Sequence, residues 1–246
     1  MKTIQIKGPV IDSGTGEFMK MFGADSYSYP SKLKSDLSDA NGADVILEIN
    51  SPGGITSAAS EMYTDLKNYS GNVEVHVVGE ADSAGSLIAM AGDKVLMSPT
   101  SLMMIHRAAT SADGNTDDMT STKQALDEID QNIVNAYATK TGKNKRDIYD
   151  LMSKTTWMNA ETAVKQGFAD GLMEFDKDKQ DKVAAPMLNS AIPVPHLDMK
   201  MVNEFKEFLS TSIKDKPEKI KKKENEENTD TSKLVNHKLA LLFGGK

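Results

Sequence analysis

The chain has 246 residues, a formal net charge of −7 and no cysteine. Its apolar fraction of 39% is enough for a packed core, and its mean hydropathy of −0.43 is typical of a soluble protein. The missing cysteine excludes disulfides, thiol catalysis and thiolate metal sites. The acidic excess lies in residues 1–174, which argues against nucleic acid as a partner.

Residues 1–12 alternate like a strand and lack the long apolar core of a signal peptide. No apolar run approaches the about 18 residues of a membrane span. We therefore expect a cytoplasmic protein that has no membrane partner and binds no metal or cofactor.

Strand and helix patterns alternate through the first 175 residues. Further strands are predicted at 44–50, 73–79, 94–97 and 102–105, and helices at 55–69, 83–91, 116–140, 145–153 and 160–166. A short turn and strand at 168–175 closes the series. This order predicts an α/β fold with right-handed crossovers and a largely parallel sheet.

Helix 116–140 has an apolar stripe that needs a partner surface, either in its own domain or on a second subunit. The composition then changes near residue 176, where a charged linker begins. Residues 176–246 form a proline-broken, charged extension that we expect to be largely disordered, with a short amphipathic helix and an apolar end. We therefore predict a domain over 1–175 and a separate extension over 176–246.

Three candidate groups follow predicted strands. The first internal strand breaks into Ser51-Pro52-Gly53-Gly54, and the second leads into a small-residue turn that holds Ser83. His106 comes directly after the apolar run 102–105. Because parallel strands build sites at their carboxyl ends, these groups fit a nucleophile, a general base and backbone donors for an oxyanion.

Each group has a simpler interpretation when taken alone. A glycine pair is a tight turn, a serine at a helix start is an N-cap, and a histidine at a strand end is structural. The glycine pair also lacks the longer patterns of nucleotide-binding loops. Ser86, one turn into the helix, is a weaker nucleophile candidate than Ser83. Their combination favours a serine hydrolase.

With these residues assembled, the chain resembles the ClpP family of serine peptidases (family S14) over about residues 7–175. The phrases that carry the resemblance lie at 49–54, 79–85, 104–106 and 157–170. The resemblance implies a ClpP/crotonase-like fold of repeated ββα units, with a long handle helix from Thr116. It also implies heptameric rings that can stack, Ser83 as nucleophile, His106 as base, and the amides of Gly54 and Ala84 as oxyanion donors.

The chain departs from the family pattern at the third position of the triad. The family's aspartate corresponds to Thr155, which can accept a hydrogen bond but carries no charge. Either the enzyme is a slow dyad or another carboxylate substitutes. Asp150 is the first candidate and Asp147 the second, although both are also ordinary surface charges for a helix.

The extension further resembles phage head-maturation (prohead) proteases, which cut scaffold and capsid proteins inside a procapsid. We therefore predict a serine endopeptidase of capsid maturation, with an extension that is removed by self-cleavage. A ClpP-type subunit fed by an AAA+ unfoldase is the alternative within the enzymes. A catalytically inactive, ring-forming scaffold protein is the alternative from another class.

Overall fold

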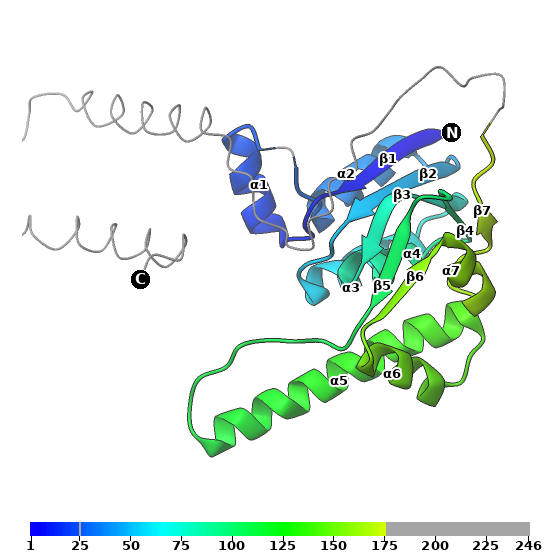
Figure 1. The fold of residues 1–246 in the computed structure, drawn as a ribbon. Coiled ribbons are helices and arrows are strands. Elements are labelled where there is room, and N and C mark those ends of the chain that lie inside the picture. Colours follow the sequence, from blue (N-terminus) through cyan, green and yellow to red (C-terminus); the bar gives the residue numbers. More distant parts are fainter. Residues whose placement is uncertain (25, 176–246) are drawn as a thin grey trace, which may run out of the picture. The chain divides into compact units, whose positions relative to one another are not determined.

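The computed structural model describes residues 1–24 and 26–175 (Figure 1). The predicted extension 176–246 and the boundary before it lie outside the described residues, so both stay predictions. In the part that is described, no helix combines the length and the apolar character that a bilayer span requires. That part also holds no group of three or more metal-ligating side chains.

A mostly parallel, seven-stranded sheet forms the centre of the described chain. Its main path runs β1-β2-β3-β4-β7, and β5 joins the far end of β3 and then pairs antiparallel with β6. The strands are β1 (Lys2–Lys7), β2 (Val45–Ser51), β3 (Val73–Asp82), β4 (Lys94–Met97), β5 (Leu102–Ile105), β6 (Thr156–Asn159) and β7 (Gly171–Leu172). The α/β class and the largely parallel sheet are confirmed.

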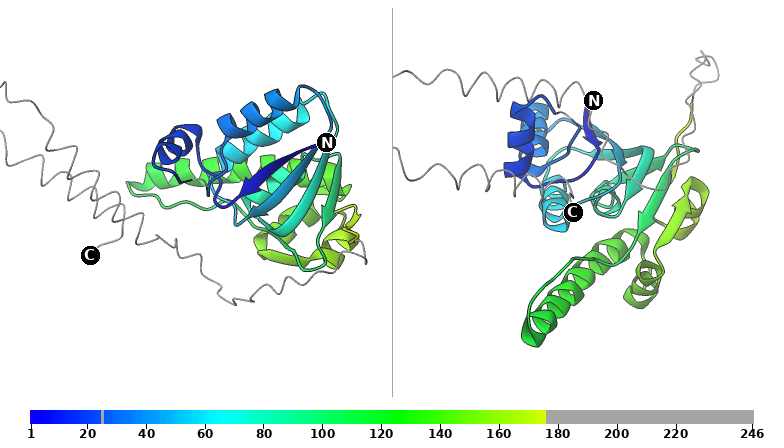
Figure 2. Two further views of the ribbon diagram at one scale, coloured as in Figure 1. Left: turned by 90° about the horizontal axis from the view of Figure 1, so that it is seen from above. Right: turned by 60° about the vertical axis from the view of Figure 1, so that its left-hand side comes forward.

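The helices are α1 (Ser13–Met21), α2 (Pro30–Ala40), α3 (Thr56–Lys67), α4 (Ala84–Ala89), α5 (Thr116–Thr141), α6 (Lys145–Ser153) and α7 (Ala160–Gln166). Helix α3 packs between α2 and α4, and α4 lies against β2 and β3. Figure 2 shows α2 and α3, in blue and cyan, over the same face of the sheet. The core forms where every second residue of β2 and β3 turns its apolar side chain toward these helices.

One predicted boundary was wrong in a way that matters for the site. Strand 73–79 does not end at Gly79, because residues 80–82 continue it and pair with Leu102, Met103 and Met104 of β5. Helix α4 accordingly begins at Ala84, and Ser83 occupies the single position between strand and helix. Helices α1 and α2 and strand β6 had no sequence prediction.

Helix α5 is confirmed and has two unlike halves. It starts at a capping box formed by Asn115 and Asp118 and ends at Gly142, whose φ of 69° is left-handed. Its C-terminal half buries Ile133 and Tyr137 in the core, while Met119 in the N-terminal half is 39% exposed. Figures 1 and 2 show this N-terminal half extending away from the rest of the described fold.

Candidate active site

Ser83 sits at the sharp turn between β3 and α4, with a φ of 53° and a ψ of −116°. A left-handed φ costs a non-glycine residue about 1–3 kcal/mol, so surrounding bonds must hold it. Its N–H donates to the carbonyl of Met104 at 2.8 Å, and its own carbonyl accepts from the Leu87 N–H at 3.1 Å. The side chain of Ser83 makes no capping hydrogen bond to α4, so its hydroxyl is not used by the helix.

His106 reaches Ser83 because of the register between β3 and β5. Asp82 lies beside Met104 in parallel pairing, so the residues just beyond both strand ends are neighbours. Nε2 of His106 lies 2.7 Å from Oγ of Ser83. When Nε2 accepts the hydroxyl proton in this contact, the neutral ring carries its own proton on Nδ1. The structure therefore brings together the two side chains that the sequence singled out.

The glycine turn packs directly against the Ser83 turn. Gly53 has a φ of 95° and Gly54 one of 150°, values that favour glycine. A Cβ on Gly53 would lie 2.7 Å from Cβ of Ser83, and one on Gly54 would lie 2.1 Å from the carbonyl oxygen of Val10. The glycine turn can lie this close to the Ser83 turn because Gly53 lacks a side chain, and this close to the Val10 backbone because Gly54 lacks one.

Two backbone donors next to Ser83 are unused. Within residues 1–24 and 26–175, neither the Gly54 N–H nor the Ala84 N–H donates to another group. Both residues line a small hollow of about 90 Å³ together with Ser83 and His106. A negatively charged oxygen in that hollow could take a hydrogen bond from each of them.

The Nδ1 side of His106 is built differently. In the described chain, Nδ1 has no hydrogen-bond partner. Thr155 lies close by in sequence register, since Ile105 pairs with Thr156 across β5 and β6. Its side chain, however, is exposed and makes no hydrogen bond to the ring. Thr155 also has a left-handed φ of 52°.

The two carboxylates considered as substitutes are engaged elsewhere. Asp150 lies on the exposed side of α6 and pairs with Arg146 at 3.3 Å. Asp147 accepts a hydrogen bond from the Asn144 side chain at 2.7 Å, at the start of the same helix. Neither carboxylate is hydrogen-bonded to His106.

A buried clamp, which the sequence analysis did not predict, holds the segment that follows His106. Asp130 of α5 is fully buried and accepts from Nε of Arg107 at 2.6 Å and from the Ala108 N–H at 2.7 Å. The Arg107 guanidinium also lies 5.1 Å from the ring centre of Tyr149. The bond to Asp130 raises the pKa of Arg107, so this side chain stays charged. The clamp fixes the chain on the C-terminal side of the histidine.

A buried carboxyl next to the serine was also missed. Asp82 is only 3% exposed, and its Oδ1 has no hydrogen-bond partner within the described structure. Burial, and second the nearby Glu80, raise the pKa of Asp82 to about 7. The sequence signal that could have revealed it was an acidic residue inside a strand end that is otherwise small and apolar.

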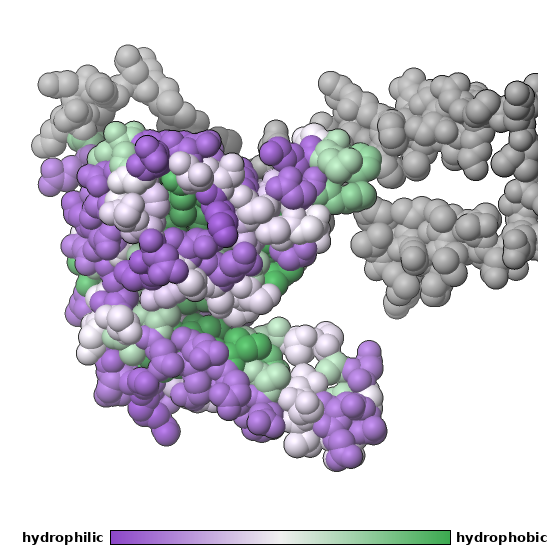
Figure 3. All heavy atoms as spheres, turned by 180° about the vertical axis from the view of Figure 1, so that it is seen from behind, coloured by the Kyte–Doolittle hydropathy of each residue, from purple (hydrophilic) through white to green (hydrophobic). Residues whose placement is uncertain are grey.

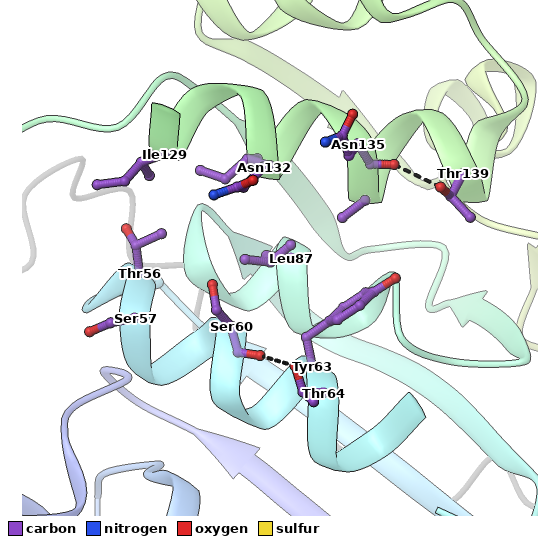
Figure 4. Close-up of a pocket in the computed structure, with 12 residues that line it drawn as sticks. Thr56, Ser57, Ser60, Tyr63, Thr64, Leu87, Ile129, Asn132, Asn135 and Thr139 are labelled. Atoms are coloured by element: carbon purple, nitrogen blue, oxygen red, sulfur yellow. Dashed lines mark hydrogen bonds between the residues drawn. The ribbon is translucent and has the colours of Figure 1, made fainter. Parts of the chain in front are cut away.

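A larger groove of about 600 Å³ runs between α3 and α5. It meets the small hollow at Thr56, Leu87 and Ile133, which line both. Figure 4 shows hydroxyl and amide side chains of α3 and α5 facing each other across it, with Leu87 between them. None of its lining residues is charged. Figure 3, a view from behind, shows apolar residues gathered where the lower part of the described fold, which holds α5 and α6, meets the rest.

Comparisons with known proteins found a matching family model and a similar curated protein. A family model described as Clp protease matches residues 33–176, more than half of the chain. The chain is also 28% identical, over 182 residues, to the ATP-dependent Clp protease proteolytic subunit of Streptococcus mutans serotype c. That alignment covers 72% of this chain and 87% of the relative.

Proposed function

The chain belongs to the Clp protease family of serine peptidases, and from that premise we propose that it is an endopeptidase that forms an acyl-enzyme on Ser83. The observation that carries the proposal is the 2.7 Å contact between Oγ of Ser83 and Nε2 of His106. The unused N–H groups of Gly54 and Ala84 beside that contact support it.

The proposed reaction follows from these positions. Nε2 of His106 takes the proton of Ser83 as Oγ attacks the peptide carbonyl, and the oxyanion accepts hydrogen bonds from Gly54 and Ala84. Collapse of this intermediate breaks the C–N bond, and the imidazolium gives its proton to the leaving amine. Water then attacks the ester, loses its proton to His106, and releases the acid and the free serine.

We infer that the enzyme works as a Ser83–His106 dyad. No carboxylate in the described part of the chain bonds to Nδ1, so the imidazolium forms without a charged partner. In a serine protease, removing this charge lowers kcat by roughly 10⁴, while the oxyanion donors still contribute. The proposed enzyme is therefore slow.

A fluorophosphonate probe tests the chemistry, because it reacts with a serine that has been activated as a nucleophile. The wild-type protein should become labelled, and the Ser83→Ala variant should not. Ser153→Ala is the matched control, because it removes the hydroxyl of an exposed serine on α6 and keeps Ser83. Absence of labelling on the wild-type protein would favour the inactive, ring-forming scaffold. Labelling that persists in Ser83→Ala would place the nucleophile elsewhere.

Capsid and scaffold proteins are the finer substrate proposal. It rests on the 70 residues that follow the family match at 176 and on the neutral third triad position. A slow protease suits a procapsid, where early activity would destroy the shell. If the extension is removed by self-cleavage, wild-type protein should lose it over time while Ser83→Ala stays intact. Equal loss from both proteins would end that part of the proposal.

Partnership with an AAA+ unfoldase is the second candidate, favoured by the name of the Streptococcus mutans relative. A ring of seven subunits, single or stacked, is the assembly proposed in both cases. The exposed N-terminal half of α5 supports it, because Met119 and its neighbours have no partner surface within the described fold. Hydrolysis of a folded substrate that requires an unfoldase and ATP would favour this candidate over capsid maturation. Light scattering would give the number of subunits.

A further inference from the structure

A chain of buried hydroxyls links α5 to the Ser83 turn. The hydroxyl of Tyr137 lies 2.8 Å from Oγ of Ser86. Oγ of Ser86 lies 2.7 Å from the carbonyl oxygen of Ser83 and 3.1 Å from that of Met104. Ser86 is fully buried and Tyr137 is 1% exposed, so water does not compete for these bonds.

The direction of the hydrogen bonds follows from the number of protons. A serine hydroxyl has one proton, and both carbonyl oxygens can only accept. If Ser86 donated to Tyr137, its lone pairs would face two carbonyl oxygens without a proton between them. Tyr137 must therefore donate to Ser86, which in turn donates to Ser83, the nearer carbonyl. Burial raises the pKa of Tyr137, which keeps that donor protonated.

The carbonyl of Ser83 belongs to the same peptide plane as the N–H of Ala84. A bond to the carbonyl oxygen fixes the rotation of this plane, and so fixes where the N–H points. It also polarises the peptide, which makes its N–H a stronger donor. Ser83 is at a left-handed φ, so this plane needs such support.

We propose that Tyr137 and Ser86 are positioning residues that orient and polarise the Ala84 N–H for the oxyanion. This rests on the proposed acyl-enzyme chemistry of Ser83. Neither side chain contacts the reacting atoms through its hydroxyl, since both hydroxyls are taken up within the relay. The edge contact between Tyr137 and Phe168, with ring centres 5.5 Å apart, holds the phenol in place.

The test is Tyr137→Phe, which removes one oxygen and keeps the packed ring. We expect kcat for peptide hydrolysis to fall about tenfold, less than the 10²–10³ that follows loss of a direct oxyanion donor. KM should stay unchanged. A peptide boronate, whose adduct with Ser83 places an oxygen between the two N–H groups, should bind about tenfold more weakly. Tyr69→Phe is the control, because it removes a phenol hydroxyl that donates to the carbonyl of Ala43, away from the relay and the groove.

Ser86→Ala interrupts the same relay at its second member. The double variant that combines Tyr137→Phe with Ser86→Ala should lose no more activity than Ser86→Ala alone, since the phenol acts only through the serine. A loss confined to Tm, or one that appears in KM instead of kcat, would assign the relay a purely structural role and overturn the inference. Additive losses would overturn it as well. A wild-type protein that neither cleaves peptides nor reacts with fluorophosphonate would overturn both this inference and the proposed function, whereas full activity in Tyr137→Phe would overturn the inference alone.

Discussion

The two ring nitrogens of His106 have very different surroundings. Nε2 meets a hydroxyl at 2.7 Å in a turn that β5, α4 and the glycine turn hold from three sides. Nδ1 faces no hydrogen-bond partner in the described structure, and its neighbour in register, Thr155, is exposed. The described structure therefore provides the contact through which His106 takes the proton of Ser83, but it provides no partner for the other ring nitrogen.

This difference shows that placing the two side chains and stabilising the charge of the imidazolium are separate tasks in this site. Sheet register and helix packing place Ser83 and His106, and these do not depend on the residue at 155. Stabilising the imidazolium, in contrast, needs one negative charge at one position. A fold can therefore keep its nucleophile in place while its rate is set by a single side chain on the opposite side of the ring.

The Nε2 side can be broken most severely by His106→Ala. Without the base, the hydroxyl of Ser83 keeps its proton. Because the missing carboxylate has already cost roughly 10⁴ of the roughly 10⁶ that a whole triad provides, kcat should fall by about a further 10². The measurement is steady-state hydrolysis of an unstructured peptide. A loss smaller than tenfold would mean that the 2.7 Å contact is not used in the reaction.

Gly54→Ala should be next in size, because its Cβ would collide with the backbone of Val10. The turn must then move, which takes the Gly54 N–H away from the oxyanion. We expect kcat to fall by about 10–10², because the N–H is displaced and not removed, with Tm lowered as well. Gly23→Ala is a control for a left-handed glycine, since a Cβ there meets nothing within 4 Å. Equal loss of kcat in both variants would contradict the assignment of Gly54.

Thr155→Asp would supply the missing charge on the Nδ1 side. We expect kcat to rise by about 10–10²-fold, part of the roughly 10⁴ that a fully aligned carboxylate provides. Thr155→Asn is the matched control, because Asn and Asp both tolerate the left-handed φ of 52° but only Asp is charged. A similar gain in both would show that backbone relief, not charge, is responsible. Asp150→Asn should leave kcat unchanged, because that carboxylate pairs with Arg146.

The sequence could predict those site residues that local patterns reveal, but not those that depend on contacts between distant segments. Ser83, His106 and Gly54 could be found because each follows a clear apolar strand and the strands are parallel. The continuation of β3 to Asp82 could not, since the pairing with β5 depends on residues 22 positions away. The partners of Asp130 and Tyr137 were hidden for the same reason. Both lie on a helix whose sequence shows periodicity but not which neighbour each residue meets.

A change in the Asp130 clamp should disturb the alignment of His106 with Ser83 less severely than the substitutions above. Asp130→Asn keeps the shape but replaces a carboxylate that accepts from both Arg107 and Ala108. The chain after His106 should become less well fixed, and we expect kcat to fall about three- to tenfold. Asp127→Asn is the control, because that carboxylate is 41% exposed, pairs with Lys123, and meets Arg107 only at its outer nitrogen, at 3.3 Å. The clamp has no part in aligning the base if both variants keep full activity.

The smallest expected effect concerns stability and not rate, at the buried carboxyl that precedes Ser83. The raised pKa of Asp82, about 7, means that the folded protein keeps a proton which the unfolded chain loses near pH 4. The free energy of unfolding should therefore fall as the pH rises from about 4 to about 7. Asp82→Asn should remove this fall and raise Tm by a few degrees at pH 8, with little change at pH 4. Glu80→Gln should give part of the same gain, because Glu80 is the second cause of the shift. A Tm gain that is the same at both pH values would show that the charge of Asp82 is not what costs stability beside the nucleophile.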